Sequence, residues 1–179
     1  MRCFKLFSLF TILLTLVCVS CQTKEKGEVR VTSPEVATQK IKDQFVVANQ
    51  LILQKESDEM DAYERSHQLR FVKTTSGVRY HVYKPSASGD SIRKGMPVSL
   101  NYTVYLLDGS LCYSSDVDGT KHFIVEQEQI ESGIHRGLQY LKKGDKALLL
   151  IPSHLAHGLL GDFKKIPPQM PIIYNVEVF

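Results

Sequence analysis

From residue 71 onward, apolar and polar residues alternate in several short segments. Alternation with a period of two is typical of β-strands that bury one face. It is clearest in residues 77–85, 96–106 and 171–179. The predicted buried faces are Val78, Tyr80 and Val82 in the first segment, Val98, Leu100, Tyr102 and Val104 in the second, and Ile172, Tyr174, Val176 and Val178 in the third.

The region between these strands contains one short helical pattern. Residues 122–125 predict a further strand. A helix is then predicted from Ser132, with Ile134, Leu138 and Leu141 on its buried face, before a glycine stop at Gly144 and a strand that runs into Pro152. We therefore expect residues 70–179 to form an α+β domain with an antiparallel sheet and one embedded helix.

A helical extension is predicted over residues 33–69. Ser33 is a suitable cap, Pro34 suits the first helical position, and an apolar face recurs at Ile41, Phe45, Ala48 and Ile52. A second short helix is predicted over residues 58–69, with Met60, Tyr63 and His67 on one face. The apolar face of the first helix has two interpretations: it packs on the following domain, or it forms a homodimer with a second copy of the chain.

The first residues resemble a targeting segment. Residues 1–20 combine Arg2 and Lys5 with an uncharged apolar run, which is the layout of a secretory signal peptide. The run ends in "LVCVSC", which resembles a bacterial lipobox and predicts cleavage after Ser20 and lipidation of Cys21. Residues 21–32 are then a polar tether, and the protein is anchored by lipid to a membrane of the bacterial cell envelope. The alternative is an ordinary signal peptide with an incidental cysteine.

Several kinds of chemistry are not favoured by the sequence. The formal net charge is only +3 and no dense basic block is present, which argues against nucleic acid as a partner. His122, His135, His154 and His157 lack cysteine or carboxylate neighbours at zinc-binding intervals, so no metal is expected. Cys112 has no basic neighbour to activate it, and no phosphate-binding glycine motif occurs. We expect no cofactor.

Three segments in a fixed order carry a resemblance. They are "NYTVYLLDGSLCYSS", "HFIVEQEQIESGIHRGLQYLKKGDKALLLIPSHLAHG" and "KIPPQMPIIYNVEVF". Together they resemble the FKBP-type peptidyl-prolyl cis-trans isomerases over roughly residues 76–179. The resemblance implies an FKBP-like antiparallel sheet wrapped around one short helix. The lipoprotein-like front end is similar to that of secreted bacterial members, such as Bacteroidetes gliding-motility lipoproteins and the infectivity-potentiator group.

The resemblance also implies a site. It assigns catalytic roles to Tyr102, His157 and Tyr174, and substrate binding to Ile130, Glu131, Ile134, Ile166, Cys112 and Tyr113. This sequence departs from the family pattern at several positions. Glu131 replaces an aliphatic residue and Tyr174 a phenylalanine. Cys112-Tyr113 replaces a Phe-Asp pair, Ile134 a tryptophan, His157 a tyrosine and Lys121 a phenylalanine. We therefore expect a dry apolar cup that is less aromatic than usual and lacks the acidic side chain of the Phe-Asp pair.

The implied activity is rotation of Xaa-Pro bonds in unfolded or extended polypeptides, which would assist the folding of exported proteins. The chemistry needs no nucleophile, because a pocket that favours the twisted amide accelerates the exchange. Two alternatives from other classes stay open: a non-catalytic peptide-binding or chaperone module of the envelope, and a structural accessory of an envelope machine.

Overall fold

The computed structural model describes residues 34–179. The predicted signal peptide, Cys21 and the polar tether therefore lie outside the described residues. Residues Asp43–Phe179 form one compact unit, which begins inside the first described helix.

Helix α2 (Pro34–Ser66) is a single helix, and the expectation of two helices was wrong. After Pro34 the segment contains neither glycine nor proline, so nothing in it breaks the helix. Side-chain pairs four residues apart bridge the expected break: Gln54 donates to Asp58 at 2.9 Å, and Lys55 lies 3.6 Å from Glu59. Among residues 34–179 no helix is long and apolar enough to cross a membrane.

Seven strands form one antiparallel sheet. They are β1 (Val72–Lys73), β2 (Arg79–Lys84), β3 (Pro97–Leu106), β4 (Leu111–Ser114), β5 (Lys121–Ile124), β6 (Lys146–Ile151) and β7 (Ile172–Val178). The order is β1-β2-β6-β7-β3-β4, and β5 also pairs with β3. Three short helices interrupt the strands: α3 (Ser115–Asp118), α4 (Ser132–Leu138) and the 3-10 turn η2 (Ser153–Leu155). The predicted α+β fold with an N-terminal helix is confirmed.

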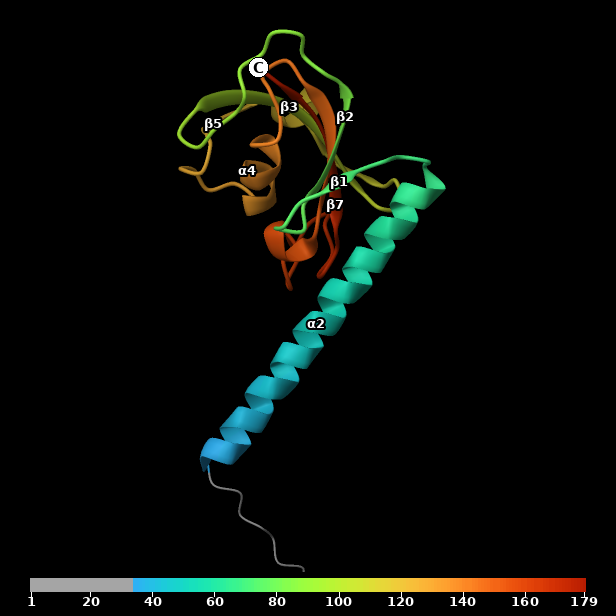
Figure 1. Cartoon of the computed structure of the whole chain (residues 1–179), viewed down its shortest axis with the longest axis vertical. Helices are drawn as coiled ribbons and strands as arrows, with labels where there is room; N and C mark the ends of the chain where they lie inside the picture. Colours follow the sequence, from blue (N-terminus) through green and yellow to red (C-terminus); the bar gives the residue numbers. More distant parts are fainter. Residues whose placement is uncertain (1–33) are drawn as a thin grey trace, which may run out of the picture. The chain divides into compact units, whose positions relative to one another are not determined.

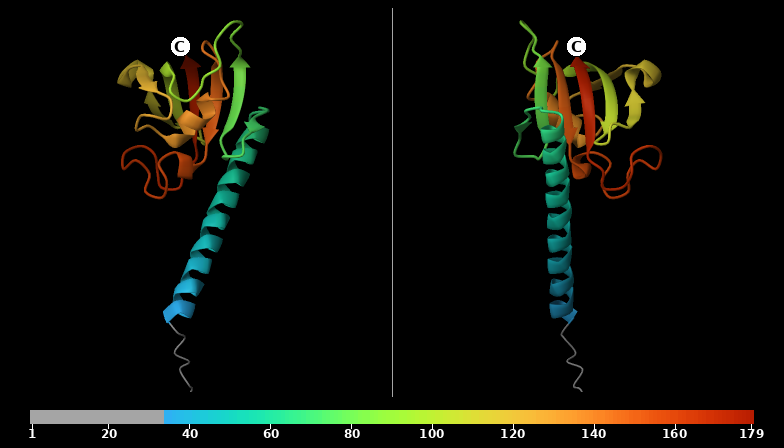
Figure 2. Two further views of the ribbon diagram at one scale, coloured as in Figure 1. Left: turned by 60° about the vertical axis from the view of Figure 1, so that its left-hand side comes forward. Right: turned by 90° about the vertical axis from the view of Figure 1, so that its right-hand side faces the viewer.

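The main core lies between α4 and the face of the sheet that curves around it (Figures 1 and 2). The predicted inward side chains are there. Val78, Leu100, Val104, Tyr174 and Val176 are each at most 2% exposed, and Ile134, Leu138 and Leu141 from the helical segment are at most 1% exposed. Alternation of period two therefore predicted this face correctly.

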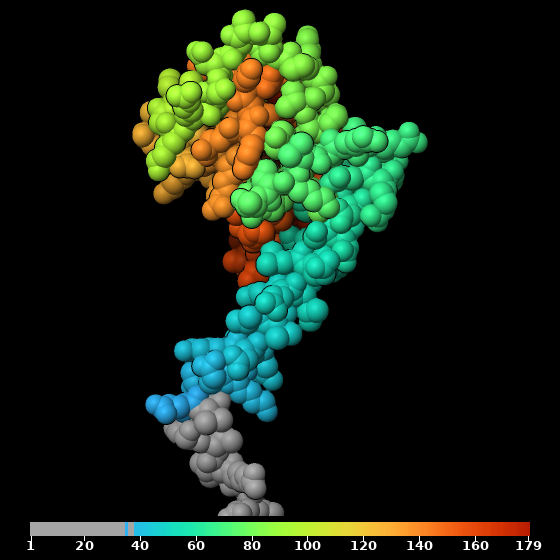
Figure 3. Space-filling model, in the orientation of Figure 1, coloured from blue at the N-terminus to red at the C-terminus, as the bar shows by residue number. Residues whose placement is uncertain are grey.

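The opposite face of the sheet is covered by the last turns of α2. Met60 packs there with Leu150 of β6 and Ile173 of β7, and Tyr63 and Phe71 border them. In the space-filling view the carboxy-terminal part of α2 meets the residues of β1 and β2 directly (Figure 3). The predicted apolar face further up the helix does not take part, because Phe45 is 66% exposed. The interpretation that this face packs on the domain was therefore wrong.

Arg79 attaches α2 to this face of the sheet. It follows Val78 and so points to the α2 side of the sheet, where its side chain is only 4% exposed. Its guanidinium donates to Asp61 at 2.7 Å, to Glu64 at 2.5 Å, and to the backbone carbonyl and hydroxyl oxygens of Ser57 at 3.0 Å. Burying a charge is costly unless it is paired. Ser57, Asp61 and Glu64 of α2 together offset the cost of burying the Arg79 guanidinium.

Replacing Arg79 with leucine should lower the free energy of unfolding by about 3 kcal/mol, because Glu64 loses its cation in a partly buried place and Asp61 keeps only Lys73. Urea denaturation of the two proteins measures the difference. The matched control is Lys73→Gln, which removes a 55% exposed lysine from the same Asp61 carboxylate. It should cost less than about 1 kcal/mol. Equal losses in the two variants would contradict the importance of the buried pairs.

Candidate active site

A pocket of about 300 Å³ opens beside β3, β4 and β5. Its walls come from β3, β4, β5, β7, the turn before α4 and the loop between η2 and β7. The lining residues are Tyr102, Tyr113, Lys121, Glu131, His157, Asp162, Lys164 and Tyr174. We call this hollow the charged pocket. It brings together five of the residues singled out from the sequence, namely Tyr102, Tyr113, Glu131, His157 and Tyr174.

The other four candidate residues do not line the charged pocket. Cys112, Ile134 and Ile166 are buried in the main core at 2%, 1% and 3% exposure, and Ile130 packs against that core from its edge. Burial raises the pKa of the Cys112 thiol, which favours the unreactive protonated form. These four residues therefore pack behind the residues that line the charged pocket.

Glu131 is the centre of the charged pocket. It comes directly before α4, and its side chain is 14% exposed. Its Oε1 atom accepts a hydrogen bond from the Tyr174 hydroxyl at 2.8 Å and lies 3.4 Å from Nε2 of His157. Burial alone would raise the pKa of this carboxyl, but the His157 hydrogen bond, the Lys121 charge and the Tyr174 hydroxyl outweigh it and lower the pKa to about 2.

Lys121 forms the cationic side of the charged pocket. Its ammonium nitrogen lies 4.8 Å from the centre of the Tyr102 ring and 5.8 Å from that of Tyr174. Both distances allow cation–π attraction. The nitrogen is 3.8 Å from Oε2 of Glu131, which is an ion pair but too long for a hydrogen bond. The Lys121 N–H groups therefore make no hydrogen bond to Glu131.

Asp162 organises the loop on the other side. One of its carboxylate oxygens accepts from the backbone N–H groups of Lys164, Lys165 and Ile166 at 2.8–2.9 Å, and the other accepts from the Tyr113 hydroxyl. Burial would raise the pKa of Asp162, but the Tyr113 and backbone hydrogen bonds lower it to about 2. The same bond to Asp162 raises the pKa of Tyr113 to about 12.

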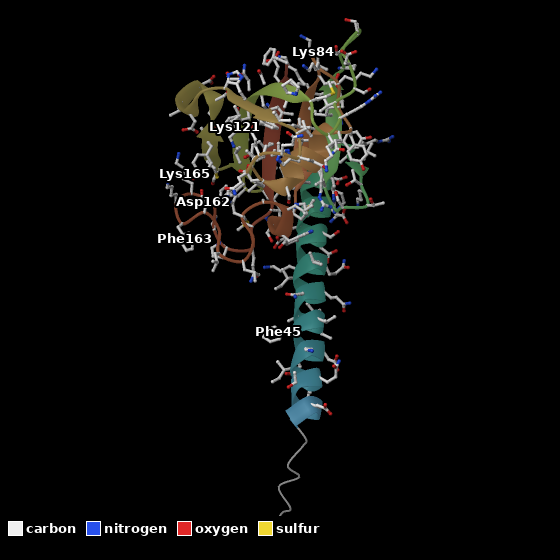
Figure 4. All side chains as sticks on the ribbon, turned by 90° about the vertical axis from the view of Figure 1, so that its left-hand side faces the viewer. Phe45, Lys84, Lys121, Asp162, Phe163 and Lys165 are labelled. Atoms are coloured by element: carbon white, nitrogen blue, oxygen red, sulfur yellow. The ribbon has the colours of Figure 1, made fainter. Side chains whose placement is uncertain are left out.

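The preceding Gly161 is required by this loop. Its φ is +69°, and a Cβ there would lie 2.2 Å from the backbone oxygen of Ile166. Asp162 and Lys121 lie on the same side of the domain, whereas Phe163 points outward and is 83% exposed (Figure 4). Asp162 was missed in the sequence. An aspartate placed just before a polar turn that leads to two prolines was the available signal, because such side chains commonly cap their own loop.

The expectation of an apolar cup was wrong. Two carboxylates, Glu131 and Asp162, line the charged pocket together with Lys121 and His157. The physical reason is that the apolar candidates point into the core, while the residues beside them in the chain face the hollow. The carboxylates stay ionised there because each has several donors.

The arrangement can bind and orient a polar chain but contains no nucleophile–base pair. The part of the chain that the structure describes holds no group of three or more histidine, cysteine or carboxylate side chains able to bind a metal. The available groups are the rings of Tyr102 and Tyr174, the Lys121 ammonium and the His157 imidazole. They suit the non-covalent binding of a peptide segment.

Comparison with known families agrees with this geometry. The family model described as FKBP-type peptidyl-prolyl cis-trans isomerase matches residues 89–179. The chain belongs to this family. The matched residues contain every member of the charged pocket, from Tyr102 to Tyr174. They do not include α2.

Two bacterial FKBP-type relatives are longer than this chain. A probable FKBP-type isomerase of Haemophilus influenzae is 34% identical over 108 residues, which are 60% of this chain and 44% of the relative. The probable isomerase FkpA of Neisseria meningitidis is 33% identical over 60% of this chain and 39% of its own length. The crystal structure of FkpA from Escherichia coli superimposes with a TM-score of 0.60 at 25% identity, covering 81% of this chain and 70% of that one. The chain thus spans less than half of each of the two sequence relatives.

The depressed pKa of Glu131 predicts a stability that depends on pH. Because the folded-state pKa is about 2 and the usual value is 4.5, the carboxylate stabilises the fold above pH 4.5 and loses this effect as the pH falls towards 2. Over that range the free-energy difference between wild type and Glu131→Gln should shrink by up to about 3 kcal/mol. Urea denaturation between pH 2.5 and 7 in roughly half-unit steps measures it. Asp162 is present in both proteins, so its own titration cancels. A difference that is constant with pH would contradict the assignment.

Proposed function

We propose that the protein is a peptidyl-prolyl cis-trans isomerase whose substrate segment binds in the charged pocket. The observation that carries this proposal is the pair of tyrosines, Tyr102 and Tyr174, in an FKBP-type domain. Their ring centres are 5.9 Å apart with planes inclined at 43°, and the cation of Lys121 lies against both. A volume of about 300 Å³ is at the small end of ligand pockets and fits a prolyl residue with its neighbours.

The reaction requires only that the twisted amide be bound better than the planar one. The uncatalysed barrier is about 18–20 kcal/mol, because rotation interrupts amide resonance. An acceleration of a thousandfold to a hundred-thousandfold requires about 4–7 kcal/mol of preferential stabilisation. The aromatic wall removes water from the prolyl ring. The Lys121 ammonium is a hydrogen-bond donor for the substrate. Where it reaches the amide nitrogen it favours the twisted state, because the nitrogen lone pair can accept a hydrogen bond only when the amide is twisted.

A non-catalytic peptide-binding module is the second candidate. The loop beside the charged pocket exposes three large apolar side chains, Leu159, Leu160 and Phe163, at 61%, 66% and 83%. Such a surface suits the capture of extended chains, with or without bond rotation.

The decisive measurement is the cis-to-trans exchange rate of Xaa-Pro peptides, followed by NMR without a coupled protease. Wild type should accelerate exchange, and Tyr102→Ala should lower kcat/KM by about tenfold or more, about 1.4 kcal/mol, because the aromatic wall is lost. Tyr105→Ala is the matched control, since Tyr105 lies on the same strand but packs on the α2 side. It should leave the rate within about twofold under conditions where both variants are folded. Peptide binding by wild type with no acceleration would favour the binding module.

We further propose that the protein acts in the bacterial cell envelope as a lipid-anchored member of the secreted subgroup that resembles gliding-motility and infectivity-potentiator lipoproteins. The support is the "LVCVSC" sequence after an uncharged apolar run. Cys21→Ser should abolish acyl labelling and move the protein from the membrane to the soluble fraction. Its control is Cys112→Ser, which removes the buried core cysteine and should leave labelling unchanged. Wild type without an acyl group would refute the anchor. The clients are proposed to be exported polypeptides that contain proline.

A homodimer through α2 is proposed on the apolar side chains that the helix exposes. Phe45 and Leu51 are both 66% exposed, and Val46 and Val47 are 54% exposed. The double variant Phe45→Glu, Leu51→Glu should convert a sedimenting dimer into a monomer, whereas Gln50→Glu, which replaces a side chain that is already polar, should not. A wild type that sediments as a monomer at high concentration would refute the dimer.

A further inference from the structure

Glu56 is a buried carboxylate outside the charged pocket. It lies on α2, outside the residues that match the family, and is 2% exposed. Its Oε2 accepts from the backbone N–H of Ser153 at 2.8 Å, and its Oε1 accepts from the Ser153 hydroxyl at 2.5 Å. Both oxygens are thus bound by one residue, itself 3% exposed, that lies 97 positions further along the chain. Such a doubly bonded, buried charge fixes its partner tightly.

Ser153 is the first residue of the segment that carries His157. Its carbonyl oxygen accepts from the backbone N–H groups of Ala156 at 2.9 Å and Gly158 at 2.8 Å. These two residues flank His157 directly. Gly158 has a φ of +65°, a left-handed conformation that suits glycine, and its carbonyl accepts from Gln169 at 2.9 Å. The backbone N–H of Ser153 therefore binds Glu56, and its backbone carbonyl holds the two neighbours of His157.

The chain of contacts ends in the charged pocket. His157 reaches Glu131, which also accepts from Tyr174. A second contact runs in parallel, because the hydroxyl of Ser132, the residue after Glu131, donates to the backbone oxygen of Leu155 at 3.4 Å. The segment from Ser153 to Gly158 thus links α2 on one face of the sheet with the pocket.

We propose that Glu56 is a positioning residue for the charged pocket: through Ser153 it holds the backbone on both sides of His157 and so sets where the imidazole meets Glu131. For its effect on turnover this inference rests on the proposed isomerase function. A small misplacement of a binding group is costly for catalysis, so a distant residue that fixes the loop affects the rate without touching substrate.

The competing explanation is that Glu56 only attaches α2 to the domain. The chain offers a matched control, because Asp61 on the same helix also joins α2 to the sheet through a carboxylate, but its partners are Lys73 and Arg79 and not the pocket loop. If attachment is all that matters, Glu56 and Asp61 variants of equal stability should behave alike.

The test compares the full chain carrying Glu56→Ala, Glu56→Gln or Asp61→Asn with wild type. Glu56→Ala should lower kcat/KM on Xaa-Pro peptides by about tenfold, and Asp61→Asn by less than about twofold. Glu56→Gln should recover most of the loss, because its amide can accept from the Ser153 N–H and donate to the hydroxyl. Amide hydrogen exchange of Ala156 and Gly158, and the NMR signals of the His157 ring, should change in Glu56→Ala and not in Asp61→Asn.

The outcomes separate the two proposals. Wild type without acceleration would refute the isomerase function, and the exchange and His157 signals would still decide the positioning role. Equal effects of Glu56→Ala and Asp61→Asn on rate and on the loop signals would refute that role. Should Glu56→Ala not fold, Ser153→Ala removes only the hydroxyl donor. It should lower kcat/KM by about threefold and speed exchange at Gly158, and unchanged values would overturn the proposal.

Discussion

The pairing of β6 with β7 is the interaction on which the rest of the structure depends. The two strands run antiparallel from Lys146 opposite Glu177 to Ile151 opposite Ile172. Both are buried along the face towards the main core, and their other face is buried where Leu150 and Ile173 lie. Since successive side chains of a strand point to opposite faces, neighbouring residues serve different layers. Tyr174 enters the main core and its hydroxyl reaches the charged pocket, while Ile173 packs against Met60 of α2. The pairing of β6 with β7 thus supports both the charged pocket and the surface on which α2 packs.

The charged pocket is stable because its charges compensate one another. Glu131 has Tyr174, His157 and Lys121 around it, and Asp162 has the Tyr113 hydroxyl and three backbone N–H groups. A buried carboxylate without such donors would take up a proton instead. Because these partners are held before any substrate arrives, the site presents fixed dipoles with little rearrangement during binding. Selectivity for the substrate segment then depends on electrostatics as well as on the shape of the aromatic wall.

Much of the fold could be predicted from the sequence, because a half-buried sheet requires alternation and the chain shows it clearly. The predictions failed where side chains meet across long sequence distances. The contact between Glu56 and Ser153, and the cluster of Ser57, Asp61 and Glu64 on Arg79, bury polar residues that local patterns assign to solvent. The single helix was missed because Ser57 and Asp58 are good caps locally, whereas packing of Met60 and Tyr63 on the sheet favours continuation. The polar lining of the pocket depends on which of two adjacent residues faces inward in irregular loops, and no periodicity fixes that.

The polar contacts of α2 determine how the helix lies on the sheet more than how strongly it adheres. Apolar contacts such as those of Met60 are not directional, and the helix could slide or rotate along them with little loss. Glu56 and Glu64 lie eight residues apart on one side of the helix and bind separate partners, Ser153 and Arg79. Moving the helix by one residue would break both and leave buried charges unpaired, at a cost larger than that of any single apolar contact. Two such anchors therefore fix both the axial position and the rotation of the helix. The locked register of α2 thus adds a second fixed point, besides the end of β6, for the loop that carries His157.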